Sequence, residues 1–318
     1  MFKDMLLNLK RILCFIVVAL SVKTIQAQDS SVRVQGRYIQ LSDIIVRSDI
    51  NVSDFIRRVR DDTTFYKAFR NLRTLSYSAI NDVRMVDKKG VLLASLNSKT
   101  HQTRTGNCRS MEVLEEKTTG NIRDNKGDWN YYTAQLYAGL FFTTGSICGE
   151  TNIVQGTMVN IDQLSGMEKH KEQLKMLFFN PGKSIPGIPF IGNKMDIFSK
   201  KAADLYDYSI DRQRYNGKDC YVFTVKSKDD LSKGQKDDIV IDEMTTWFDP
   251  KTMEVQGRVY DMSYDAGLYD FNVHMEAQLG KYEGLLVPTL LRYNGNWGVV
   301  LKKRERGIFT ATLYDFGK

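Results

Sequence analysis

Three aspartates, Asp261, Asp265 and Asp270, are the residues whose types and spacing come closest to a catalytic arrangement. Paired carboxylates perform acid–base catalysis when a cleft holds them at a fixed separation. Asp265 lies in a predicted loop beside glycine, whereas Asp261 and Asp270 alternate with aromatic residues on predicted strands. This pattern favours the solvated faces of strands, so the sequence predicts no catalytic residue. An enzyme remains the third hypothesis, and it requires Asp261 and Asp270 to converge in a cleft.

Motifs for other kinds of catalysis and for cofactors are missing from the sequence. It has no phosphate-binding loop, no His-Glu-x-x-His, no Cys-x-x-Cys and no Gly-x-Ser-x-Gly. No recognisable motif ties a cysteine to His101, His170 or His274. The segment 124–128, DNKGD, begins like a calcium loop, but Lys126 stands at a ligand position and the downstream Glu is missing. The sequence therefore predicts neither a metal nor a cofactor.

Two cysteines are predicted to form a disulfide. Cys108, in GNCRS, and Cys148, in SICGE, both lie near glycine in turn-like sequence. An oxidising compartment permits such a bridge. Cys220 lies in KDCYVFTV, an apparent strand, and is predicted to be a buried free thiol.

The first 27 residues have the features of a cleaved secretory signal. Lys3, Lys10 and Arg11 form a positive start, Ile12–Val22 is an apolar run, and Ala27 offers a small residue for cleavage. The apolar run is too short for a membrane span, although an N-terminal anchor is the alternative. No later apolar run approaches the ~20 residues of a membrane helix, so no transmembrane span is predicted in the mature chain.

Composition and charge are those of a globular domain. The 318 residues are 42% hydrophobic and 26% charged. Residues 1–27 hold four Lys or Arg and one Asp, so their removal lowers the formal net charge from +7 to +4. A mildly basic, exported chain is not expected to bind nucleic acid.

The stretch Gly267–Leu279 carries the clearest structural pattern. From Tyr269 onward, every second residue is apolar and the residues between them are polar or ionisable. This period of two predicts a strand with one buried and one wet face, and it places His274 on the wet face. At ~3.3 Å per residue the strand would run roughly 40 Å, about twice an ordinary strand. So long a strand indicates a curled sheet that wraps around something.

The remaining elements predict an α+β, β-rich fold, in which a curled antiparallel sheet, an open barrel built as a meander, packs on several helices. Turn signals such as Asn216-Gly217 separate about seven strands from Tyr206 onward, and a hairpin over 74–98 extends them. The predicted helices cover 51–73, 130–142 and 165–179. The predicted organisation is a signal peptide over 1–27, an N-terminal arm over 28–50, and a single β-rich domain over 51–318 with a helical and loop insert at about 99–200.

This order of elements resembles the outer-membrane lipoprotein carrier (LolA-like) fold, an open barrel closed by helices. The matching residues are the turn Trp247–Thr252, WFDPKT, the strand Val255–Tyr260 that follows, and the Leu286–Pro288 segment, LVP. The resemblance covers about 54–316 and implies a fold that can hold an apolar ligand. It also implies the periplasm or the outer-membrane periphery of a Gram-negative bacterium.

The leading functional hypothesis is non-enzymatic binding of a lipid or lipoprotein acyl chain in an apolar cavity. A curled sheet with helices inside it can leave room for such a chain. The candidate lining residues are Tyr269, Phe271, Val273, Met275, Leu136 and Leu140. The alternative is a structural or protein-interaction module of the envelope, with a filled core and another envelope protein as partner.

The densest basic run is LKKRERG, residues 301–307. Its charged residues are Lys302, Lys303, Arg304 and Arg306, with Glu305 among them. One interpretation is the solvated end of two strands, whose charges protect a sheet edge from pairing. The other is a patch for anionic lipid head groups or a negatively charged partner.

Overall fold

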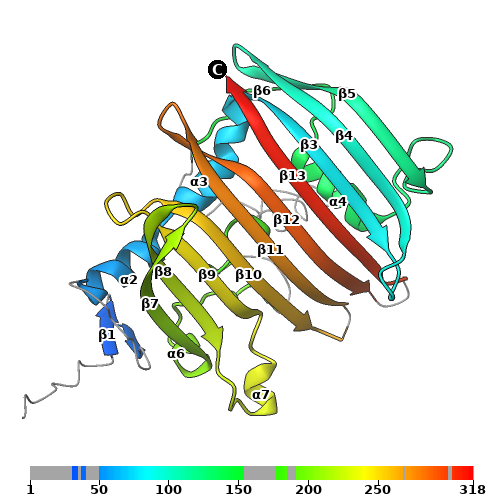
Figure 1. Cartoon of the computed structure of the whole chain (residues 1–318). Helices are drawn as coiled ribbons and strands as arrows, with labels where there is room; N and C mark the ends of the chain where they lie inside the picture. Colours follow the sequence, from blue (N-terminus) through cyan, green and yellow to red (C-terminus); the bar gives the residue numbers. More distant parts are fainter. Residues whose placement is uncertain are drawn as a thin grey trace, which may run out of the picture.

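The computed structural model describes residues 31–34, 37–40, 50–153, 177–184, 191–267, 269–299 and 303–317. Within these ranges, eleven strands form one curled antiparallel sheet (Figure 1). The strands are β3 Ser76–Val86, β4 Leu92–Thr105, β5 Cys108–Gly120, β6 Ser146–Cys148, β7 Tyr206–Tyr215, β8 Lys218–Ser227, β9 Ile241–Phe248, β10 Val255–Asp265, β11 Tyr269–Tyr282, β12 Leu285–Val299 and β13 Glu305–Gly317. The predicted β-rich fold is therefore confirmed.

The strand order is β6-β5-β4-β3-β13-β12-β11-β10-β9-β8-β7. Strands β7 to β13 follow one another both in the chain and in the sheet, which confirms the seven-strand meander. The predicted turn at Asn216-Gly217 has φ angles of 49° and 78°, which is the left-handed geometry of a tight hairpin. Strand β13 then pairs with β3, so the hairpin β3–β4 extends the meander as predicted.

Strand β11 shows the alternation that the sequence indicated. Its apolar residues Phe271, Val273, Met275, Ala277 and Leu279 are all buried, and the residues between them are exposed or half-buried. Neighbouring strands alternate in register with it, so one face of the sheet is apolar from β4 to β7 in the sheet order. This face is the concave one, and helices cover it.

Strand β5 corrects the prediction of a helical and loop insert at about 99–200. Strands β4 and β5 occupy this stretch as far as residue 120, and β6 follows within it. From Glu112 to Gly120 every side chain of β5 is exposed, on both faces of the strand. With no face to bury, β5 has no apolar alternation, and only its backbone pairing with β4 makes it a strand.

Two further segments stand apart from the large sheet. The short strands β1 Ser31–Val34 and β2 Arg37–Gln40 pair with each other within the predicted N-terminal arm. The predicted signal segment 1–27 and most of the helix predicted over 165–179 lie outside the described residues.

The helices within the described residues are short. They are α2 Val52–Asp61, α3 Thr64–Asn71, the 3-10 helix η1 Leu72–Thr74, α4 Tyr132–Phe141, α6 Ala202–Leu205 and α7 Lys233–Lys236. Among the described residues, no helix combines the length and the apolarity needed to cross a membrane. The stretch 51–73, predicted as helical, holds α2, α3 and η1. Asn51 caps α2, because its Oδ1 atom accepts a hydrogen bond from the backbone N–H of Asp54 at 3.0 Å.

Helices α2, α3 and α4 pack against different parts of the concave face (Figure 1). In α2, the ring of Phe55 meets the rings of Tyr221 and Phe248 at centroid distances of 5.8 and 5.9 Å. In α3, the buried Asn71 donates a hydrogen bond to the Leu286 carbonyl oxygen at 2.7 Å. Helix α4 packs on β13. Together these contacts remove the apolar face of the sheet from water, which is the main source of stability in such a fold.

Truncating Phe55 tests how firmly α2 is attached. We expect Phe55→Ala to lower the free energy of unfolding by about 3–5 kcal/mol, because the side chain is 3% exposed and leaves a cavity between α2 and β8–β9. Chemical denaturation measures this change. Ile80→Ala is the control, since Ile80 is 53% exposed and its truncation should stay within about 0.5 kcal/mol. Equal small effects of both substitutions would show that α2 does not contribute to the core.

Candidate functional site

An apolar pocket lies between α4 and the concave face of β11, β12 and β13. Its described walls come from α4, from residues 178–179 and from alternate residues of the three strands. The lining residues are Thr133, Leu136, Tyr137, Leu140, Phe141, Phe178, Phe179, Met275, Leu291, Tyr293, Trp297 and Phe309. All of these side chains except Thr133 are apolar or aromatic, so the walls suit a hydrocarbon better than a polar ligand.

The enclosed space in this pocket is small, about 40 Å³. It exceeds the ~10–15 Å³ that one water molecule needs. It is far below the roughly 300–1,000 Å³ of sites that hold drug-sized ligands. In this conformation the side chains therefore fill most of the space between α4 and the sheet.

Two glycines lie next to the pocket residues Tyr293 and Phe309. Gly295 of β12 and Gly307 of β13 are paired in register on the concave face. A Cβ atom on Gly295 would lie 2.5 Å from the Tyr293 hydroxyl, and one on Gly307 would lie 2.8 Å from the Phe309 ring. The missing side chains allow these rings to lie flat over the sheet, where their centroids are 4.9 Å apart and their planes 12° apart.

Helix α4 is rich in apolar residues. Ala134, Tyr137 and Ala138 are buried. Leu136 and Leu140 are half-buried and line the pocket together with Tyr137. Burial raises the pKa of Tyr137, so its hydroxyl stays protonated and can donate a hydrogen bond to Asn81 Oδ1 at 3.2 Å.

The N-terminus of α4 is capped by a side chain from another element. Tyr131, which precedes the helix, makes no side-chain cap. Glu305, at the start of β13, accepts hydrogen bonds from the backbone N–H groups of Tyr132 and Thr133 at 2.9 and 2.7 Å, and from the Thr133 hydroxyl at 2.6 Å. A carboxylate at this position satisfies free N–H groups and complements the helix dipole. It also fixes α4 to β13.

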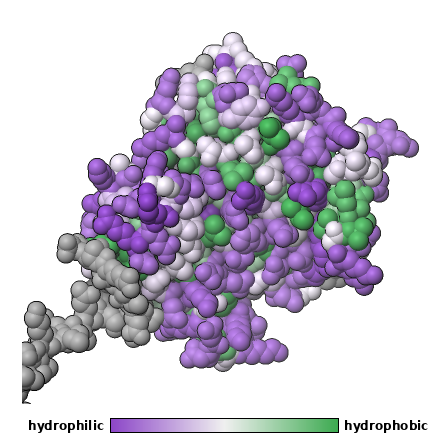
Figure 2. Space-filling model, in the orientation of Figure 1, coloured by the Kyte–Doolittle hydropathy of each residue, from purple (hydrophilic) through white to green (hydrophobic). Residues whose placement is uncertain are grey.

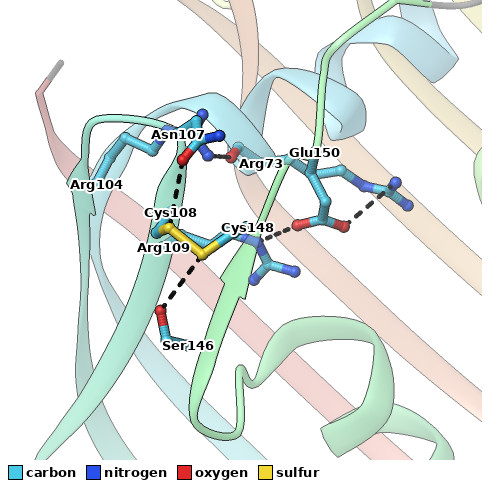
Figure 3. Close-up of a disulfide and its surroundings, with 8 residues drawn as sticks. All are labelled: Arg73, Arg104, Asn107, Cys108, Arg109, Ser146, Cys148 and Glu150. Carbon is cyan, nitrogen blue, oxygen red and sulfur yellow. Dashed lines mark hydrogen bonds and ion pairs between the residues drawn. A yellow bond between two sulfur atoms is a disulfide. The ribbon is translucent and has the colours of Figure 1, made fainter.

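The chain after α4 is fixed by a disulfide and an ion-pair cluster (Figure 3). Cys108 of β5 and Cys148 of β6 are bonded, as the sequence predicted, and they are also paired in register. Glu150 pairs with Arg109 at 2.5 Å and with Arg73 at 3.4 Å. Arg109 also donates a hydrogen bond to Thr143, close to the end of α4. Cys220 is a buried free thiol, again as predicted.

The structure divides the predicted lining residues into two groups. Met275, Leu136 and Leu140 line the pocket. Phe271 and Val273 are buried on the same face of the sheet but do not line the pocket. The centroid of the Phe271 ring lies 4.8 Å from that of Trp297. Tyr269 is only half-buried.

The sequence prediction missed most of the aromatic residues that line the pocket. The period of two in β12 and β13 would have found Leu291, Tyr293, Trp297 and Phe309, whereas Phe178 and Phe179 carry no such pattern.

Comparisons with known proteins leave the chain without an assigned family. No family model matches it, and no curated protein matches it. Among solved structures, a DUF1329 family protein from Desulfovibrio piger is 15% identical and has a TM-score of 0.24. The match covers 80% of this chain and 93% of that chain. A likeness at this TM-score supports no conclusion about function.

The three aspartates with catalytic potential do not converge. Asp265 and Asp270 face each other at the β10–β11 turn and line a polar cleft of about 590 Å³. Asp261 lies opposite His274 of β11. It is four residues from Asp265 along β10, which corresponds to a distance of roughly 13 Å. Asp270 forms an ion pair with Arg304 at 2.5 Å. Among the described residues, no group of three or more His, Cys, Asp or Glu could hold a metal ion.

His274 lies on the convex face, as the alternation predicted. Its Nδ1 atom is 2.8 Å from Asp261 Oδ1, and its Nε2 atom is 3.5 Å from Glu276 Oε1. Arg292 pairs with the other oxygen of Glu276 at 3.0 Å. Partial burial lowers the pKa of His274, but the hydrogen bonds and charges of Asp261 and Glu276 outweigh this effect, so the pKa is raised above 6.5.

The residues of the basic run 301–307 lie in different surroundings. Lys302 lies outside the described residues, Lys303 is exposed, and Arg306 is half-buried on β13. Arg304 is engaged with Asp270. The run therefore presents fewer free charges than its sequence suggests.

Removing the Glu305 carboxylate should loosen α4. We expect Glu305→Ala to lower the free energy of unfolding by about 1–2 kcal/mol, because the first turn of α4 loses its cap. Amide hydrogen exchange of Tyr132–Phe141 should accelerate more than that of β13. Glu112→Ala, at an exposed position of β5, is the control and should change neither quantity. Unchanged exchange in α4 would contradict the capping role.

The His274 cluster should make stability depend on pH. We expect the His274 titration, followed by NMR, to have its midpoint above 6.5, and Asp261→Asn to lower that midpoint. The protonated ring is stabilised in the folded state, so its contribution is complete below about pH 6.5 and is lost as the pH rises through the raised pKa. The stability difference between wild type and His274→Gln should shrink over that range. A midpoint below 6.5 would refute the assignment.

Proposed function

We propose that the chain binds one apolar chain, such as the acyl chain of a lipid or lipoprotein, between α4 and the concave face of the sheet. The observation that carries this proposal is the composition of the pocket, whose twelve described lining residues include a single aliphatic hydroxyl side chain, Thr133. A hydrocarbon placed there would lose no hydrogen bonds on entry and would gain contact with aromatic rings.

The order of elements supports the same proposal. A curled sheet whose concave face is covered by helices resembles the outer-membrane lipoprotein carrier fold. In that architecture an acyl chain would lie between the sheet and its covering helices. The proposal also takes the chain to be an exported envelope protein, on the basis of the signal-like segment 1–27.

The small enclosed volume sets a condition on binding. With about 40 Å³ free, an acyl chain enters only if α4 moves away from β12 and β13. Leu136 and Leu140 then exchange contacts with the aromatic wall for contacts with the ligand. The attachments that resist this motion are the Glu305 cap and the Tyr137 side chain, whose ring centroid lies 4.7 Å from that of Phe309.

A second candidate function is protein binding by a domain with a filled core. The small volume of the pocket favours it, and so does the edge of the sheet. Strand β6 pairs only with Cys108–Ser110, so the described sheet ends at the edge of β5 from Met111 to Gly120. An exposed strand edge can accept a strand from another protein.

A substitution inside the pocket separates the two candidates. We expect Leu136→Glu to weaken binding of N-phenyl-1-naphthylamine, a neutral apolar fluorescent probe, at least about tenfold, because the carboxylate must be desolvated in the pocket. Gln135→Glu is the matched control, since Gln135 is exposed on the same helix and Glu is an equally good helix former. It should leave binding unchanged.

Native mass spectrometry of the purified protein provides an independent measurement. A bound lipid that is present in wild type and in Gln135→Glu but lost in Leu136→Glu supports the proposal. Absence of lipid from wild type, together with no probe binding, contradicts it. A protein that co-purifies and is displaced by substitutions in Met111–Gly120 would then support the second candidate.

A further inference from the structure

An exposed group of aliphatic residues lies at the corner of the sheet where β3 turns into β4. Val91, Leu92 and Leu93 are 58%, 49% and 39% exposed, although they are consecutive and all apolar. Figure 2 shows hydrophobic surface over the start of β4. Further along β4, the side chain of Leu96 is fully buried. Contiguous exposed apolar groups of this kind mark interaction sites.

The hairpin that carries these residues is well ordered. The carboxylate of Asp87 accepts hydrogen bonds from the backbone N–H groups of Lys89 and Val91 at 2.7 and 2.9 Å. Gly90 has a φ of 80°, which the turn requires. Val86 then pairs with Leu92 across the hairpin. The exposure of the aliphatic side chains is thus a property of a fixed structure.

Positive charge surrounds the same corner. Lys88 and Lys89 are exposed in the turn. Strand β13 pairs with β3 at Gly307 and Met85, so Arg306, one residue before this point, lies beside Val86 at the start of the hairpin. None of the side chains of Lys88, Lys89 and Arg306 forms an ion pair with a described residue. The nearby carboxylates are occupied, Asp87 by the turn and Glu305 by the N-terminus of α4.

We propose that this corner, formed by Lys88–Leu93 together with Arg306, binds the surface of an anionic lipid bilayer. Three aliphatic side chains on a protruding turn can enter the head-group region, while the adjacent basic side chains meet lipid phosphates. The combination is complementary to such a surface in both polarity and charge. A second copy of the chain is a poorer partner, because two corners placed together would bring like charges into contact.

The position of the corner relates it to the pocket. The N-terminus of α4 is held by Glu305, one residue before Arg306. The corner and the start of α4 therefore lie at the same end of the sheet. The bilayer-binding inference does not rest on the proposed function, but the two fit together, since a chain that exchanges acyl groups must approach a membrane.

Vesicle co-sedimentation of the purified protein tests the inference. Wild type should bind phosphatidylcholine vesicles that contain phosphatidylglycerol, bind pure phosphatidylcholine vesicles more weakly, and lose affinity as salt rises. The double substitution Leu92→Asp with Leu93→Asp should weaken binding at least about tenfold. Lys88→Glu with Lys89→Glu should weaken binding and flatten its salt dependence. Ile80→Asp, at another exposed aliphatic position on β3, should leave binding unchanged.

Several results would overturn the inference. These are failure of wild type to bind anionic vesicles, equal loss of binding in the Ile80→Asp control, or unchanged binding in the double substitutions while circular dichroism shows native folding. Self-association that Leu92→Asp with Leu93→Asp abolishes would assign the corner to a second copy instead. The pocket variant Leu136→Glu should still bind vesicles, and the corner variants should still bind the apolar probe, so failure of one proposal is distinguishable from failure of the other.

Discussion

The pairing of β3 with β13 is the interaction on which the rest of the structure depends. It joins the end of the chain to a strand more than 200 residues earlier, from Met85 and Gly307 at one end to Ser76 and Gly317 at the other. Without it, the meander β7–β13 and the strands β3–β6 would be separate sheets, each with an extra open edge. The single curled sheet, its concave face and the position of α4 all follow from this pairing.

The concave face then determines where the helices lie. In the sheet order β3-β13-β12-β11-β10-β9, alternate residues on this face are apolar. Exposure of such a face to water is unfavourable, so it is buried under helices. Helices α2 and α3 cover it by ordinary amphipathic packing. Helix α4 differs, because it is apolar all round and has no cap of its own. It is held by a carboxylate from β13 at one end and by the disulfide-linked segment at the other, so its stability comes from tertiary contacts more than from its own sequence.

This arrangement places two distinct surfaces at one end of the molecule. The pocket under α4 is apolar and nearly filled, whereas the β3–β4 corner is apolar, basic and exposed. The two aspartates on predicted strands lie apart from each other. Asp261 forms a hydrogen bond with His274 on the convex face, and Asp270 forms an ion pair with Arg304. The three aspartates with catalytic potential therefore lie in different surroundings, Asp261 beside His274 and Asp265 with Asp270 at the β10–β11 turn.

Local patterns in the sequence were enough to predict β11, the turns of the meander and α4, because alternation, left-handed turn residues and apolar runs act over a few neighbours. The Cys108–Cys148 bond, between residues 40 apart in the chain, was predicted from the turn-like sequence around each cysteine. Local patterns failed for β5, whose side chains are exposed on both faces, and for most of the pocket wall. The cap of α4 joins Tyr132 to Glu305, and the β3–β13 pairing brings Arg306 beside the β3–β4 hairpin. Only the tertiary structure brings such distant residues together, because the register of β3 on β13 depends on the packing of the whole sheet and on no nearby residue.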